Sequence, residues 1–152
     1  MSIEIGVEDL QDEIGILERL TTLLREVRGI RLDQMLLTQS LGEQAELCEV
    51  LTSRRNRRAV LLAEHGYRSQ DLLVALLAGA SKSEHDAIIE IFGQYVNMAE
   101  QAQSEIDINR EFFSVALSAI EGALSAASPA DATYELRSNK KSSGPVMFCR
   151  QI

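Results

Sequence analysis

Side chains that commonly carry out catalysis or bind metals are few in this 152-residue chain. Its two histidines, His65 and His85, fall at the ends of predicted helices, and no Glu-x-x-His pair of the di-iron bundle type is present. A phosphotransfer histidine would need a nearby lysine and glycine, but His85 is followed by Asp-Ala-Ile-Ile. Cys48 and Cys149 form no CxxC pair, so no zinc site is indicated. We therefore expect no catalytic residue, no metal and no cofactor, and predict that the protein is not an enzyme.

The one concentrated basic feature is the Arg-Arg-Asn-Arg-Arg run at positions 54–58. A nucleic-acid patch is one interpretation, but five consecutive helical positions face all directions around the helix. The net charge of −8 also opposes general binding to nucleic acid, which depends on basic groups. We interpret the run as a solvated surface and expect no nucleic-acid partner. Glu100, Glu105 and Asp107 are its candidate ion-pair partners by charge.

Asn109 interrupts an otherwise apolar seam in the last third of the chain. The seam is spaced alternately by four and three residues, as in an antiparallel bundle or coiled coil: Ile88, Phe92, Tyr95, Ala99, Ala102, Ile106, Asn109, Phe113, Ala116, Ile120, Ala123 and Ala127. A polar residue in such a seam lowers stability but can select one register. Asn109 therefore has two interpretations, fixing the register or contacting a partner directly.

A second stripe on the same predicted helix is the strongest functional hint. It consists of Ile108, Phe112, Val115, Ala119, Gly122 and Ala126, displaced to one side of the seam. Either another helix of the bundle covers this stripe, or the stripe forms a surface that accepts an amphipathic helix from another protein. We take the first five of these residues, with Asn109, as candidate partner-binding residues.

Long helices must position these residues, because both prolines, Pro129 and Pro145, lie in the last 24 positions. The patterns predict helices over 7–39, 43–65, 69–78 and 83–127. The first ends at a Ser40-Leu41-Gly42 turn, and Ser81 with Glu84 begins the last. We therefore predict an all-α, elongated, antiparallel up-and-down bundle of three long helices and one short helix.

The chain divides into a helical bundle at 1–128 and a C-terminal tail at 129–152. Strand-like residues at 133–136 and 146–150 flank a polar turn region, so the tail is either a β-hairpin or disordered. The acidic N-terminus does not fit a secretory signal. No run of eighteen apolar residues occurs, so we expect no membrane insertion.

The order of these parts resembles the FlgN family of flagellar export chaperones. The resemblance is carried by the long first helix, the Ser-Leu-Gly turn, Leu51-Thr52 followed by basic residues, Ile108-Asn109-Arg110-Glu111 in the last helix, and Thr133-Tyr134 in the tail. It extends over almost the whole chain.

The resemblance implies a cytoplasmic, non-enzymatic chaperone. Such a protein holds hook-associated flagellar proteins, those of the hook-filament junction, by their C-terminal helices and passes them to the type III export gate. Carried over by position, it assigns Asn109, Phe112 and their apolar neighbours to cargo binding, and Tyr134 to the cytoplasmic domain of the gate. The alternative is a structural or signalling bundle without an export role that self-associates through the second stripe, so a homodimer stays open.

Overall fold

The computed structural model describes residues 5–30 and 33–127. It confirms the prediction of an all-α bundle with three long helices and one short one. The helices are α1 (Val7–Glu26), α2 (Gln34–Glu64), α3 (Leu72–Ala78) and α4 (His85–Ala127), and 3₁₀ turns at Val27–Gly29 and Ser69–Asp71 follow α1 and precede α3. The predicted tail, including its alternative hairpin, lies outside the described residues.

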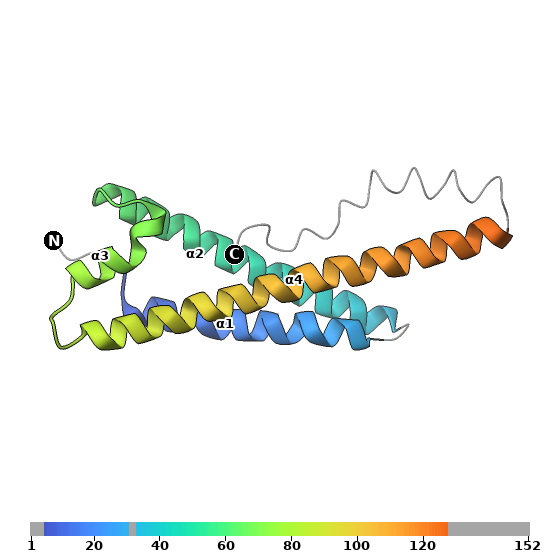
Figure 1. Ribbon diagram of the computed structural model, residues 1–152, viewed down its shortest axis with the longest axis horizontal. Helices are drawn as coiled ribbons and strands as arrows, with labels where there is room; N and C mark the ends of the chain where they lie inside the picture. The colour runs from blue at the N-terminus through green and yellow to red at the C-terminus, as the bar shows by residue number, and fades with distance from the viewer. Residues whose placement is uncertain (1–4, 31–32, 128–152) are drawn as a thin grey trace.

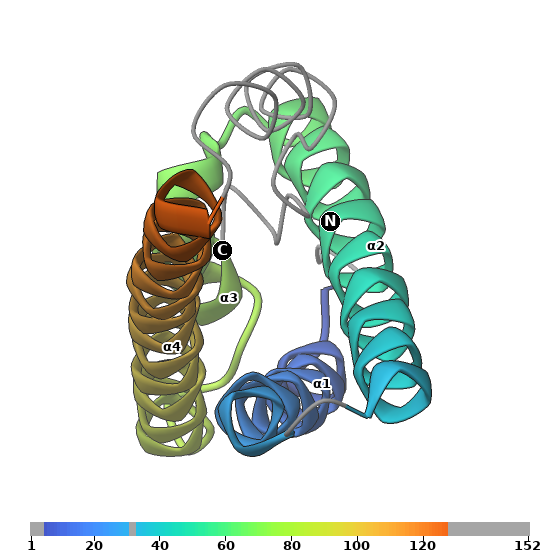
Figure 2. The same cartoon turned by 90° about the vertical axis from the view of Figure 1, so that its right-hand side faces the viewer.

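The three long helices form an open, elongated arrangement rather than a closed bundle. α1 and α4 run in the same direction and α2 runs back against both (Figure 1). Viewed end-on, α4 and α2 lie on opposite sides of α1 (Figure 2). Accordingly, α1 packs against both α4 and α2, whereas α2 and α4 hardly contact each other.

The core is aliphatic, as the sequence requires in the absence of tryptophan. One cluster joins leucines of α1 to Leu51 of α2 and to Ala102 and Ile106 of α4. A second cluster joins Leu10, Leu62 and Ile88 to the apolar face of α3. All four buried residues of α4 belong to the predicted seam: Ile88, Ala102, Ile106 and Asn109. The seam prediction is therefore confirmed up to Asn109.

The predicted end of the first helix is wrong. α1 stops at Glu26, and α2 begins after Asp33, whose Oδ1 accepts hydrogen bonds from the backbone N–H groups of Met35 and Leu36, each at 3.1 Å. This N-cap gives a new helix a favourable start only a few residues past Gly29, a poor helix former.

The Ser-Leu-Gly segment at 40–42, one of the features that carry the family resemblance, is consequently not a turn. It lies inside α2. A glycine in a helix interior costs only about 1 kcal/mol relative to alanine. A break there would also disturb Ser40 and Gln44, which are buried against the rest of the bundle.

The other helix ends follow the sequence more closely. α2 ends before Gly66, whose φ of 80° is the left-handed conformation that glycine adopts without strain. Before α4, the Glu84 carboxylate accepts the Ser81 backbone N–H at 2.8 Å, half of the predicted capping box. Before α3, the Asp71 carboxylate accepts the Arg68 backbone N–H at 3.0 Å.

Candidate partner-binding surface

The C-terminal part of α4 extends past the end of α1 (Figure 1). Arg25, near the end of α1, pairs with Glu105, and among the described residues no residue of α4 beyond Asn109 is buried. We call residues 110–127 the projecting segment. At 1.5 Å per residue it is about 27 Å long. Its side chains are therefore held by their own helix and hardly at all by the described bundle.

The second stripe predicted from the sequence is exposed on this part of α4. Ile108 is 45% exposed, Phe112 44% and Val115 64%, and Ala119 and Gly122 are also exposed. No described helix covers these five residues, which we call the exposed stripe. None of them carries a titratable group, so the only chemistry that the stripe offers is apolar contact.

A second apolar face runs along the same segment where the buried seam would have continued. It consists of Phe113, Leu117, Ile120 and Leu124, which are 36%, 44%, 54% and 41% exposed. The rings of Phe112 and Phe113 meet edge-to-face with centroids 5.3 Å apart, which links this face to the exposed stripe. The projecting segment therefore has more apolar surface than one neighbouring helix would cover.

Asn109 does not belong to this exposed surface. It is 1% exposed, and its Nδ2 donates a hydrogen bond of 2.8 Å to the carbonyl oxygen of Leu24. Its Oδ1 accepts a hydrogen bond of 2.7 Å from Nη1 of Arg28. Leu24 lies in the last turn of α1, where carbonyl groups lack helical partners. The structure thus places Asn109 where it fixes the register of α4 against the end of α1.

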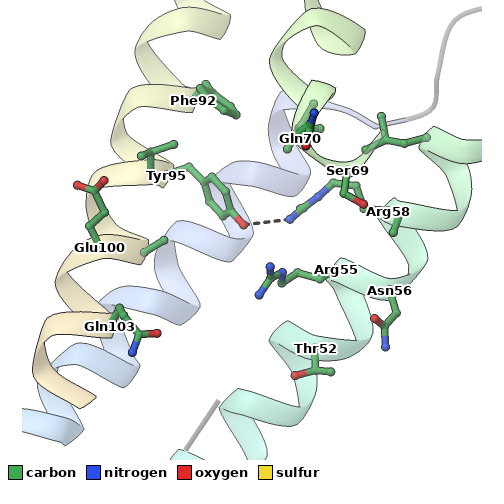
Figure 3. Close-up of a pocket in the computed structure, with 15 residues that line it drawn as sticks. Thr52, Arg55, Asn56, Arg58, Ser69, Gln70, Phe92, Tyr95, Glu100 and Gln103 are labelled. Carbon is green, nitrogen blue, oxygen red and sulfur yellow. Dashed lines mark hydrogen bonds between the residues drawn. The ribbon is translucent and has the colours of Figure 1, made fainter. Parts of the chain in front are cut away.

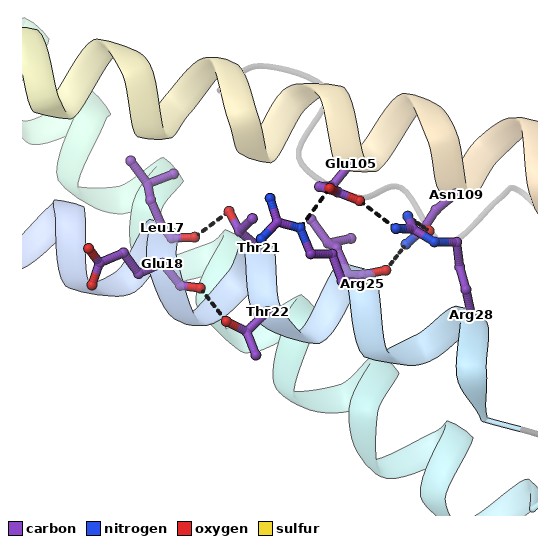
Figure 4. A network of polar contacts seen from close by, with 9 residues as sticks. Leu17, Glu18, Thr21, Thr22, Arg25, Arg28, Glu105 and Asn109 are labelled. Carbon is purple, nitrogen blue, oxygen red and sulfur yellow. Dashed lines mark hydrogen bonds and ion pairs between the residues drawn. The ribbon is translucent and has the colours of Figure 1, made fainter.

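An ion-pair network surrounds this contact (Figure 4). Glu105 of α4 accepts a hydrogen bond of 2.7 Å from Nε of Arg25 and lies 2.7 Å from Nη2 of Arg28. Burial alone would raise the pKa of Glu105, but the hydrogen bonds and charges of the two arginines outweigh that effect and lower it. The expected pairing of Glu105 with the basic run is therefore wrong, because α1 supplies both of its partners.

Two arginines of the basic run, Arg54 and Arg58, pair with α1 rather than with the acidic middle of α4. Arg58 pairs with Glu13, which is 2% exposed, at 2.5 Å, and Arg54 lies 3.7 Å from Asp12. Arg58 also donates a hydrogen bond of 3.0 Å to the Tyr95 hydroxyl, so one guanidinium joins all three long helices. Burial alone would lower the pKa of Arg58, but Tyr95 and Glu13 outweigh that effect and raise it.

The sequence reasoning did not predict a groove between the diverging helices α2 and α4. It has a volume of about 760 Å³, and its α4 wall includes Phe92, Val96, Ala99 and Glu100. Arg55 extends into it from α2 (Figure 3). A signal was present in the sequence, because residues 52–59 contain no large apolar side chain and so give α2 nothing to pack against α4.

The remaining sequence candidates lie away from this surface. His65 directly follows the last residue of α2, with its Nδ1 2.8 Å from the Leu61 carbonyl oxygen, and His85 is the first residue of α4. The described residues contain no group of three His, Cys, Asp or Glu side chains arranged to hold a metal ion. Of the described helices, none combines the length and apolar character needed to cross a membrane. Tyr134 lies outside the described residues.

Comparison with known proteins adds no relative from which a function could be transferred. No family model matches the chain, and neither a curated protein nor a solved structure matches it significantly. The surfaces of α4 and the groove beside it are thus the features from which a function can be argued.

Proposed function

We propose that this protein is a cytoplasmic flagellar type III export chaperone that binds helical segments of hook-associated proteins and delivers them to the export gate. The observation that supports the proposal is the exposed stripe, an apolar face on a helix that continues beyond its own bundle. Exposed apolar patches of this kind usually mark sites of interaction.

The stripe suits a helical client. From Ile108 to Gly122 it spans 14 helical steps, about 21 Å, and its residues recur every three or four positions. An amphipathic helix recognises such a surface through anchors with the same spacing. Ala119 and Gly122 allow close approach of a second backbone. Binding would cover the apolar face of a client helix before that helix meets its partners in the assembled structure.

The identity of the client and the gate comes from the resemblance to the FlgN family. The segment Ile108-Asn109-Arg110-Glu111 lies where the projecting part of α4 begins, which agrees with a role of the last helix in cargo binding. Tyr134 is proposed to contact the gate by the same resemblance. Binding that orders a flexible client segment has an entropic cost, so moderate affinity is expected.

Titration with C-terminal helices of hook-associated proteins from the same organism tests the proposal. Val115→Asp places a charge in the middle of the stripe and should abolish binding, because the charge would be buried without a partner. Val60→Asp is the matched control, since Val60 is similarly exposed, at 58% against 64% for Val115, but lies on α2. Circular dichroism should show both variants to be as helical as the wild type.

Two results would contradict the proposal. One is the absence of binding at about 100 μM, where even weak complexes should be detected. The other is equal loss of binding in the two valine variants, which would mean that the stripe is not the contact surface. If the chain self-associates and binds none of the hook-associated helices, the alternative of a structural or signalling bundle is favoured.

A further inference from the structure

The groove between α2 and α4 and the second apolar face of the projecting segment lie along one side of α4. Starting at Phe92 in the groove, positions alternate by four and three residues to Leu124: 92, 96, 99, 103, 106, 110, 113, 117, 120 and 124. We call these positions the α4 track. Such spacing keeps side chains on one seam of a long helix. Ile106 is 1% exposed and packs in the core with α1, so at that position the track runs beside the core. From the geometry we infer that the track pairs with the track of a second copy of this chain, antiparallel and about a two-fold axis.

The groove lacks a helix that would close the bundle. α1 packs against α2 and α4, but those two helices hardly meet on the other side. The α4 wall of the groove runs from Phe92 to Gln103, about 17 Å, or roughly three turns. A helix placed there would cover the apolar residues of the α4 wall, face the polar α2 wall with Thr52 and Arg55, and complete a four-helix arrangement.

The projecting segment of a second copy has the residues to fill that place. In an antiparallel pair centred on the turn that contains Ile108, Leu124 of one copy lies opposite Phe92 of the other. Ile120 then lies opposite Val96, and Leu117 opposite Ala99. Each of these positions is apolar, and Val96, Leu117, Ile120 and Leu124 are all at least 36% exposed in the single chain. The two-fold axis also places the projecting segment of the first copy in the groove of the second copy. Both grooves are therefore filled by one closed, isologous contact.

The charges near the centre of the track match this symmetry. Asp107 and Arg110 lie on either side of the two-fold axis and are 57% and 60% exposed. Within one chain they form only a loose pair of 3.4 Å. The antiparallel arrangement brings Arg110 of each copy beside Asp107 of the other. It therefore adds two equivalent ion pairs next to the two-fold axis.

The exposed stripe faces away from this contact. At 100° per residue, Ile108, Phe112 and Val115 point roughly opposite to Arg110 and Leu117 on the same helix. Self-association through the track thus leaves the stripe free in both copies. The inference does not rest on the proposed function, and a dimer would present two client surfaces at once.

Sedimentation equilibrium on the full chain tests the inference. Wild type should dimerise below about 100 μM. Asp107→Arg alone and Arg110→Asp alone should each weaken the dimer about tenfold or more, because each places like charges together twice. An equimolar mixture of the two variants should recover the dimer as a heterodimer, since every central contact then joins opposite charges. Monomeric wild type at 100 μM, or a mixture no stronger than its components, would overturn the inference.

A second pair of variants separates this contact from client binding. Leu117→Asp should abolish the dimer and leave the binding of hook-associated helices unchanged, whereas Val115→Asp should do the reverse. Both positions lie on the projecting segment and both are exposed, so the chain itself should stay folded. Client binding unaffected by Val115→Asp would count against the exposed stripe and not against the dimer, so the two proposals can fail separately. A dimer unaffected by Leu117→Asp would rule out the track.

Discussion

Replacing Arg58 with methionine tests how the three long helices are held together. The Arg58 side chain is only 11% exposed and pairs with Glu13, which is 2% exposed. The guanidinium also lies 5.4 Å from the centroid of the Tyr95 ring and donates to its hydroxyl. Methionine retains most of the apolar stem of arginine but removes the charge and every hydrogen bond.

The expected loss of stability comes mainly from Glu13. Removing one member of a buried ion pair typically costs about 3–5 kcal/mol, because the other charge is left without compensation. We take about 3 kcal/mol, at the lower end, because the pair retains some access to solvent through Arg58. The same substitution also removes the hydrogen bond to Tyr95, and the loss of that bond alone should cost about 1 kcal/mol or less of stability.

Urea unfolding followed by circular dichroism measures this loss. With an m value of about 1–3 kcal/mol per M, a loss of 3 kcal/mol lowers the midpoint by about 1–3 M. The double variant Glu13→Leu, Arg58→Met should recover most of the loss, since replacing both members of a buried pair with apolar groups is often neutral. Arg57→Met, on the exposed side of the same helix, should change stability by less than about 0.5 kcal/mol.

Two outcomes would refute this reasoning. A single Arg58→Met variant that loses less than about 1 kcal/mol would mean that the ion pair is hydrated, not buried as the structure has it. A double variant as unstable as the single one would mean that the Tyr95 contact or the packing of the stem, rather than the unpaired carboxylate, dominates the loss.

Three further changes probe the junction of α1 with α4 and the limit of the core. Asn109→Leu leaves the buried Leu24 carbonyl without its partner and should destabilise the protein by about 1–3 kcal/mol in urea unfolding. Because the pKa of Glu105 is lowered in the folded state, its ionised carboxylate stabilises the fold at pH values above the unfolded-state pKa. This stabilisation is lost as the pH falls through the folded-state pKa. The difference in urea midpoint between wild type and Glu105→Gln should therefore shrink from about pH 7 to about pH 3. Leu20→Ala, at a fully buried site, should cost about 2–5 kcal/mol, whereas Leu124→Ala should leave the stability of the monomer within about 0.5 kcal/mol.

Periodicity predicted the helices because each long helix buries one stripe and exposes the rest. The four buried residues of α4 were all predicted from spacing alone. The boundary between the first two helices was missed because the apolar alternation continues in sequence through the break. Two local features end α1: the low helix propensity of Gly29, and Asp33, which caps the next helix. Neither of them changes the apolar periodicity.

The missed boundary also explains which parts of the candidate site were unpredictable. Arg25 meets Glu105 across 80 positions, so a first helix that reached residue 39 would extend level with about position 119 of α4. It would then cover the seam beyond Asn109. Whether Asn109 contacts a partner or the bundle could not be decided from its own sequence neighbours, since the answer depends on where α1 ends.

The early end of α1 has a consequence for both proposed contacts. In a bundle whose helices end together, seam residues such as Phe113 and Ile120 would be core, and their hydrophobicity would only stabilise the fold. Here the same spacing continues for about 27 Å beyond the last buried residue of α4. Exposed apolar surface of this kind usually marks a site of interaction, so we expect a neighbour outside the described bundle to cover it. With two apolar faces on one helix, a second copy on the track and a client on the stripe would each cover one face.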